Sequence, residues 1–66
     1  EAVPSLVYQL GHSRADVRRW AATMLGELGP TAKEAVRPLQ DALKDPDVSV
    51  RNAARRALER VAPLHR

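Results

Sequence analysis

The feature that most constrains this chain is an internal repeat whose period is half the chain length. Residues 1–33 align with residues 34–66 without a gap, and ten of the thirty-three aligned positions hold the same amino acid. Unrelated segments would share about two or three residues. The identical pairs are Glu1/Glu34, Ala2/Ala35, Val3/Val36, Leu6/Leu39, Leu10/Leu43, Val17/Val50, Arg18/Arg51, Ala21/Ala54, Leu25/Leu58 and Pro30/Pro63. We therefore predict one domain, residues 1–66, built from two divergent copies of one unit, residues 1–33 and 34–66.

Apolar residues recur within each unit at the spacing of an α-helix. The first unit holds two apolar stripes separated at 11–14, and the second unit holds two more separated at 45–47. The stripes are Val3, Leu6, Val7 and Leu10; Val17, Trp20, Ala21, Met24, Leu25 and Leu28; Val36, Leu39 and Leu43; and Val50, Ala53, Ala54, Ala57, Leu58 and Val61. The sequence thus predicts an all-α fold of four helices, arranged as two antiparallel helical hairpins.

Residues at the expected helix ends support this division. Ser13, with Asp16 three residues later, is the expected cap of the second helix, and Asp47 is the expected cap of the fourth. Thr31 and Glu34 have the spacing of a capping box before the third helix. The segment 29–33, which begins with Gly and Pro, ends the second helix and is expected to act as a linker.

Composition narrows the function classes. The chain has no cysteine, so neither disulfides nor thiolate metal ligands are available. His12 and His65 have no further ligand at suitable spacing, and we expect no metal and no cofactor. No apolar run matches a membrane span and no signal peptide precedes the first unit, so we expect a cytoplasmic protein without membrane contact. Because the chain starts with Glu1, we interpret it as a piece of a longer protein.

Catalysis is not expected from these residues. Ser13, His12 and Asp16 could be named as a triad, but neighbours on one turn rarely converge in that geometry, and turn and cap roles explain all three. The three glycines are scattered and form no phosphate-binding loop. We predict that the chain is not an enzyme.

Specific residues resemble a known family. The segments are Ala2-Val3-Pro4, the turn Asp45-Pro46-Asp47, Val50-Arg51 and the pairs Ala53-Ala54 and Ala57-Leu58, with Val17-Arg18-Arg19 and Ala21-Ala22 in the first unit. Together they resemble HEAT-like repeats of the phycobilisome-lyase type. The resemblance implies a fragment of an α–α solenoid that binds other proteins. It also implies that Arg18 and Arg51 bond to turn aspartates such as Asp45 or Asp47, although the first turn, 11–14, lacks such acids.

The resemblance further implies that the second helix of each unit faces a partner. The partner-binding residues would be Arg18, Arg19, Arg51, Asn52, Arg55 and Arg56. Our first hypothesis is a scaffold module that binds an unidentified, acidic protein. The alternative is nucleic-acid binding, in which phosphates are contacted by Arg51, Arg55, Arg56 and Arg60 together with Arg18 and Arg19. A solvated helix face without a partner is the third interpretation.

Two helix pairs alone leave apolar ends uncovered, since repeat arrays generally need three or more units. Tyr8 and Val7 lie toward one end, Leu58, Val61 and Leu64 toward the other, and Trp20 is expected to contact a neighbouring repeat or another chain. Trp20 stands where the second unit has Ala53, so it needs additional space. We expect a homo-oligomer formed by end-to-end stacking or by hairpin exchange about the 29–33 linker. A marginally stable monomer is the alternative.

Overall fold

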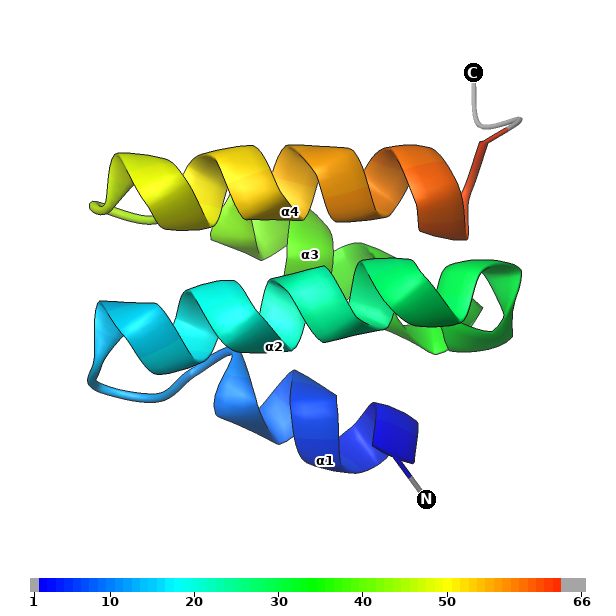
Figure 1. Cartoon of the computed structure of the whole chain (residues 1–66), viewed down its shortest axis with the longest axis horizontal. Helices are drawn as coiled ribbons and strands as arrows, with labels where there is room; N and C mark the ends of the chain where they lie inside the picture. Colours follow the sequence, from blue (N-terminus) through cyan, green and yellow to red (C-terminus); the bar gives the residue numbers. More distant parts are fainter. Residues whose placement is uncertain (1, 64–66) are drawn as a thin grey trace.

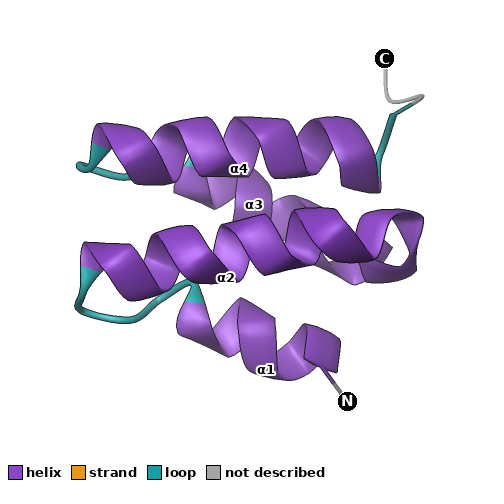
Figure 2. Cartoon of the chain, viewed as in Figure 1, coloured by secondary structure: helices purple, strands orange, loops and turns teal. Residues whose placement is uncertain are grey.

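The computed structural model describes residues 2–63, and these residues form helices joined by short turns (Figures 1 and 2). The elements are α1 (Ala2–Gln9), α2 (Ala15–Leu28), the 3₁₀ segment η1 (Gly29–Ala35), α3 (Val36–Ala42) and α4 (Val48–Val61). Within this part of the chain there is no strand. The predicted all-α fold of four helices in two hairpins is therefore confirmed.

The two second helices, α2 and α4, lie side by side and run in the same direction (Figure 1). α1 runs antiparallel along one side of α2, and α3 packs against α4 behind this pair. Both ends of α4 lie 33 positions after the matching ends of α2. The contact between α2 and α4 is the most extensive in the molecule, so this pair is the axis of the fold.

Small residues allow α2 and α4 to approach closely. Ala22 and Gly26 on α2 are buried, and so are Ala54 and Ala57 on α4. A Cβ atom added to Gly26 would lie 3.0 Å from the Cα atom of Ala57, closer than carbon atoms ordinarily pack. The core around this contact is completed by larger side chains, of which Leu25, Leu39 and Val50 are fully buried. The interhelical distance is thus set by residues without long side chains.

Of the predicted caps of α2 and α4, the first is wrong and the second is confirmed. α2 begins at Ala15 with Arg14 as its N-cap, and no side chain caps it. Ser13 precedes the N-cap by one residue. Its carbonyl oxygen and that of His12 accept hydrogen bonds from Arg18, and these bonds hold the turn in this position. The predicted cap of α4 is confirmed, since the Asp47 carboxylate accepts from the N–H groups of Ser49 and Val50.

The expected capping box at Thr31 and Glu34 does not form, because residues 29–35 form short 3₁₀ turns on the two sides of a kink at Ala32. Ala32 and Ala35 are both fully buried. Gly29 has φ +61, which ends α2 as expected. The linker is consequently a packed element that contacts α1, α2 and α4.

Two residues of the predicted apolar stripes face solvent. Trp20 is 51% exposed, and Leu43, which follows the end of α3, is also exposed. Ala22 and Gly26 were absent from the predicted stripes and are buried. These positions differ because α4 covers the side of α2 that carries Ala22 and Gly26, while the side that carries Trp20 has no such neighbour.

We predict that Gly26→Leu lowers the free energy of unfolding by about 1–3 kcal/mol or more, because the new side chain would overlap Ala57. Glu27→Leu is the matched control, since Glu27 is the next residue of α2 and is exposed. Urea unfolding followed by circular dichroism measures both. Equal stability of the two variants would contradict the close approach of α2 and α4.

Candidate partner-binding surface

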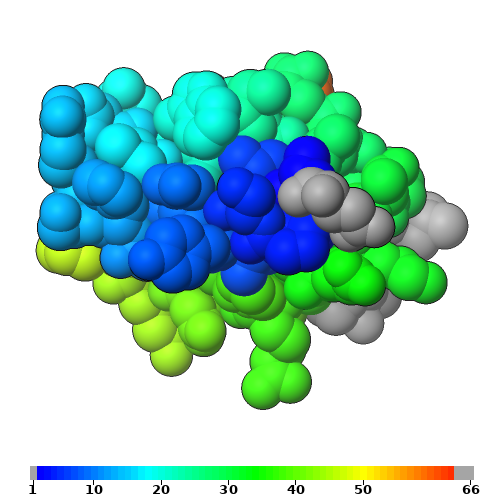
Figure 3. Space-filling view, turned by 90° about the horizontal axis from the view of Figure 1, so that it is seen from below, coloured from blue at the N-terminus to red at the C-terminus, as the bar shows by residue number. Residues whose placement is uncertain are grey.

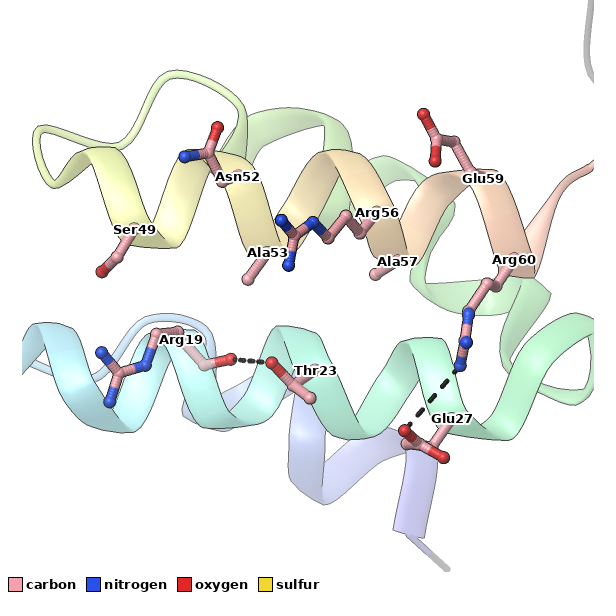
Figure 4. A pocket seen from close by; sticks show the side chains of 10 residues that line it. All are labelled: Arg19, Thr23, Glu27, Ser49, Asn52, Ala53, Arg56, Ala57, Glu59 and Arg60. Carbon is pink, nitrogen blue, oxygen red and sulfur yellow. Dashed lines mark hydrogen bonds and ion pairs between the residues drawn. The ribbon is translucent and has the colours of Figure 1, made fainter.

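A groove with a volume of about 600 Å³ runs between α2 and α4. Ala53 and Ala57 point from α4 toward α2 and form its floor, and polar side chains line its sides (Figure 4). The lining residues are Arg19, Thr23 and Glu27 on α2 and Ser49, Asn52, Ala53, Arg56, Ala57, Glu59 and Arg60 on α4. The groove follows from the small residues that bring the two helices together.

The structure places three of the predicted partner-binding residues in this groove: Arg19, Asn52 and Arg56. Within residues 2–63, no hydrogen bond or ion pair involves the guanidinium groups of Arg19 and Arg56. Asn52 accepts a hydrogen bond from Arg55 at 3.1 Å. Two exposed guanidinium groups therefore stand on opposite sides of the groove, each with all its donors available to a partner.

The charges in the groove change along its length. Toward the C-terminal ends of the helices, Arg60 Nη1 lies 3.8 Å from Glu27 Oε2, whereas the Glu59 side chain points away from α2 (Figure 4). Both members of the Arg60–Glu27 pair are mostly exposed, so the pair contributes little to stability. This half of the groove is close to neutral, whereas the half with Arg19 and Arg56 is basic.

Arg18 is not part of the groove but joins the two hairpin turns. Its Nε and Nη2 atoms donate to the two carboxylate oxygens of Asp45 at 2.7 and 3.1 Å. Its Nη1 atom donates to the carbonyl oxygens of His12 and Ser13 at 2.8 and 3.0 Å. The Arg18 and Asp45 side chains are only 15% and 9% exposed. The bond to a turn aspartate implied for Arg18 is confirmed.

Arg51, the counterpart of Arg18, completes this arrangement. Its Nη1 atom donates to the carbonyl oxygen of Asp45 at 2.7 Å, so it bonds to the backbone of the turn instead of a carboxylate. The hydrogen bonds from Arg18 hold the pKa of Asp45 below its usual value, and the Ser49 hydroxyl does the same for the pKa of Asp47. Arg18 and Arg51 are thus engaged within the chain.

The residues predicted for self-association are separated by the structure. Tyr8 is 80% exposed on α1 and Trp20 is exposed on α2, whereas Leu58 is half-buried and Val61 is buried at 3% exposure. Leu64 lies outside the described residues. Tyr8 and Trp20 are therefore available at the surface, whereas Val61 belongs to the core.

Two of the possible triad residues, His12 and Asp16, bond to Arg14, and among the described residues no hydrogen bond joins the side chains of the three. The Arg14 N–H donates to His12 Nδ1 at 3.0 Å, and the Arg14 side chain donates to Asp16 at 2.8 Å. Among residues 2–63 there is no group of three acidic or histidine side chains that could hold a metal ion. His65 lies outside the described residues. No helix found in this part of the chain has the length and apolar character needed to span a bilayer.

Several residues of the groove were not predicted. Thr23 and Glu27 on α2, and Ser49 on α4, line it without having been assigned to the partner-binding face. The pair of small residues Ala22 and Gly26, four positions apart, was the available signal, because such a pair marks the side of a helix that another helix approaches.

We predict that Asp45→Asn lowers the free energy of unfolding by about 2 kcal/mol at neutral pH, because it removes a largely buried charge-assisted pair. The pKa of Asp45 is lowered in the folded state, so its stabilisation is present above the ordinary value of about 3.9 and is lost as pH falls below it. The variant should therefore lose less stability than the wild type between about pH 5 and about pH 2.

Urea titrations across this pH range measure the difference. A residual pH dependence should persist in the variant, because the pKa of Asp47 is also lowered. Asp41→Asn, at an exposed position of α3, is the matched control and should behave as the wild type. If Asp45→Asn keeps the wild-type pH dependence, the Arg18–Asp45 pair does not stabilise the fold.

Comparison with known proteins agrees with this geometry. No curated protein and no solved structure matches the chain. A family model described as HEAT repeats matches residues 1–63, which is nearly the whole chain and includes all four α-helices. The match and the paired hairpins lead to the same conclusion: the chain belongs to the HEAT repeat family.

Proposed function

We propose that this chain is a non-catalytic scaffold module that binds an acidic segment of a protein partner in the groove between α2 and α4. HEAT repeats generally mediate protein–protein interaction and are typically non-enzymatic scaffolds. The observation that supports the specific surface is the pair of unengaged guanidinium groups, Arg19 and Arg56, on the two sides of an apolar floor.

The dimensions of the groove suit a short extended segment. α2 and α4 each have 14 residues, so each is about 21 Å long, a length that about six extended residues would cover. Carboxylates of such a segment would accept hydrogen bonds from Arg19 and Arg56, while small apolar side chains would contact Ala53 and Ala57. The neutral half of the groove would set the direction in which the segment lies.

Nucleic-acid binding has less support than protein binding. Of the arginines in that hypothesis, Arg18 and Arg51 are engaged with the turns and Arg60 lies near Glu27. Arg19, Arg55 and Arg56 remain, and so few phosphate contacts give a weak affinity with a shallow salt dependence. The two aromatic residues also offer no stacking platform on the groove side.

We also propose that the chain is built from two HEAT units of the phycobilisome-lyase type, residues 1–33 and 34–66. The support is the shared 33-residue offset of α2 and α4 and the role of Arg18 and Asp45 between the turns. In this proposal the arginine of each second helix stabilises a turn, and the residues next to it face the partner.

We predict that a fluorescent peptide of about six residues with alternating Glu and Ala binds the chain, and that Arg19→Ala and Arg56→Ala each weaken binding about tenfold. Loss of one charge-assisted hydrogen bond accounts for this size of effect. Fluorescence anisotropy measures the affinity. Arg37→Ala is the matched control. Arg37 is exposed on α3, so this substitution removes one positive charge at a site away from the groove.

Two outcomes would reject the proposal. An equal loss of affinity in Arg37→Ala and Arg19→Ala would show only a general attraction to a basic chain. Tighter binding of duplex DNA than of the peptide, abolished by Arg55→Ala with Arg56→Ala, would favour the nucleic-acid alternative.

A further inference from the structure

The acids nearest to the basic half of the groove are already engaged by other groups. Asp16 accepts a hydrogen bond from Arg14, and although it attracts Arg19 through space, no bond joins the two. Asp45 accepts from an arginine of the turns, and Asp47 accepts from the N–H groups at the start of α4. Within residues 2–63, the guanidinium groups of the two groove arginines, Arg19 and Arg56, therefore keep all their donors and a net positive charge.

A neutral donor stands beside these arginines. Asn52 lies one turn before Arg56 on α4, and its side-chain oxygen accepts from Arg55 at 3.1 Å. Its amide nitrogen has two N–H groups, and no described residue accepts from them. The nearby Thr23 hydroxyl already donates to a backbone carbonyl at 3.0 Å, so it can only accept. The basic half is thus rich in unused donors and contains no carboxylate.

The groove is open along its length. All of its lining residues belong to α2 and α4, and neither α1 nor α3 contributes a side chain to it. Figure 3 views the molecule from the side of α1: α1 crosses the middle, α2 follows the upper edge and α3 lies at the lower edge. The other helices therefore lie away from the groove, and an extended segment can reach both arginines without displacing any of them.

A phosphate monoester matches the basic half better than a carboxylate does. It carries nearly two negative charges at neutral pH and three terminal oxygens, so one phosphate can accept from Arg19 and Arg56 at once. A carboxylate has one charge and two oxygens, which a single guanidinium group satisfies. Two separate acidic side chains would then be needed to engage both arginines, and each would lose side-chain entropy.

The other half of the groove is unsuited to a doubly charged anion. Arg60 Nη1 lies 3.8 Å from Glu27 Oε2, so a phosphate placed there would meet a carboxylate together with the arginine. Repulsion by Glu27 would weaken its binding. A phosphate is therefore directed to the half that holds Arg19 and Arg56.

From this match we infer, building on the proposed function, that the basic half of the groove is a phosphate subsite and that the acidic partner segment binds there through a phosphoserine. The phosphate would bridge Arg19 on α2 and Arg56 on α4, and Asn52 would donate a further hydrogen bond. Phosphorylation of the partner would then strengthen its association with this chain.

A short phosphorylated side chain fits the floor of the groove. Ala53 and Ala57 form that floor, and they can contact a segment only if its backbone lies close to them. The phosphate of phosphoserine is a few bonds from the backbone, so both contacts can be made together. Phosphotyrosine places its phosphate farther out by the length of a ring, which would lift the backbone away from Ala53 and Ala57.

Matched fluorescent peptides test the subsite. Each has about six residues of alternating Glu and Ala, and its middle Glu is kept or replaced by phosphoserine, serine or phosphotyrosine. Fluorescence anisotropy at constant ionic strength measures the affinities. We predict that the phosphoserine peptide binds about tenfold more tightly than the Glu peptide at neutral pH, because both guanidinium groups then bond to one doubly charged group. The serine peptide should bind more weakly than both, and phosphotyrosine should give no gain over Glu.

Variants of the chain locate the effect. Arg19→Ala and Arg56→Ala should each abolish the preference for phosphoserine over Glu, because each leaves a single guanidinium group. Arg37→Ala, the control on α3, should keep it. All three arginines are exposed, so circular dichroism should show unchanged helix content. The preference should also fall between about pH 7.5 and about pH 5.5, since the phosphate takes up a proton near pH 6 while the Glu peptide stays ionised.

The failure of this inference can be distinguished from the failure of the proposed function. If the Glu peptide binds through Arg19 and Arg56 and phosphoserine gives no gain, the phosphate subsite is rejected and the groove remains the site of an acidic segment. If neither peptide binds, both proposals are rejected. A phosphoserine preference that survives Arg19→Ala and Arg56→Ala would place the phosphate elsewhere, and an equal gain for phosphotyrosine would contradict the choice of phosphoserine.

Discussion

The close contact between α2 and α4 is the constraint on which the rest of the structure depends. Gly26 and Ala57 meet at a distance that leaves no room for an added carbon atom, so the two helices are held closer than larger residues would permit. This contact explains why Ala22 is buried, and why the groove above Ala53 has an apolar floor with polar sides. A chain this short has a small core, and close packing of helices compensates for the shortage of large buried side chains.

The electrostatic arrangement divides the arginines of the second helices into two groups. Arg18 and Arg51 hold the hairpin turns through Asp45, where the surrounding protein keeps the pair largely away from solvent. Arg19 and Arg56 remain at the groove with their donors unengaged by the described residues. Residues adjacent in sequence thus have different roles, since successive positions of a helix point about 100° apart. The excess of positive charge on α4 therefore does not by itself indicate what kind of partner the helix binds.

Much of the fold could be predicted from the 33-residue period and the apolar spacing, because these directly reflect which helix sides are buried. The Arg18–Asp45 pair followed from the family resemblance. The 3₁₀ segment at 29–35 and the uncapped start of α2 were missed, because they depend on tertiary contacts of Ala32, Ala35 and Arg18 that local patterns do not encode. The groove was missed for the same reason: helical spacing separates inward from outward residues but does not show which neighbour covers each side.

The most direct test of this account is the nuclear Overhauser effect between Gly26 Hα and the Ala57 methyl group in the native chain. The account predicts a strong signal, since the two residues are in contact across the α2–α4 interface. Signals between α1 and α2 and between α3 and α4 serve as internal references for the two hairpins. Strong signals within each hairpin with none between Gly26 and Ala57 would mean that the hairpins fold separately, and would contradict the groove between α2 and α4.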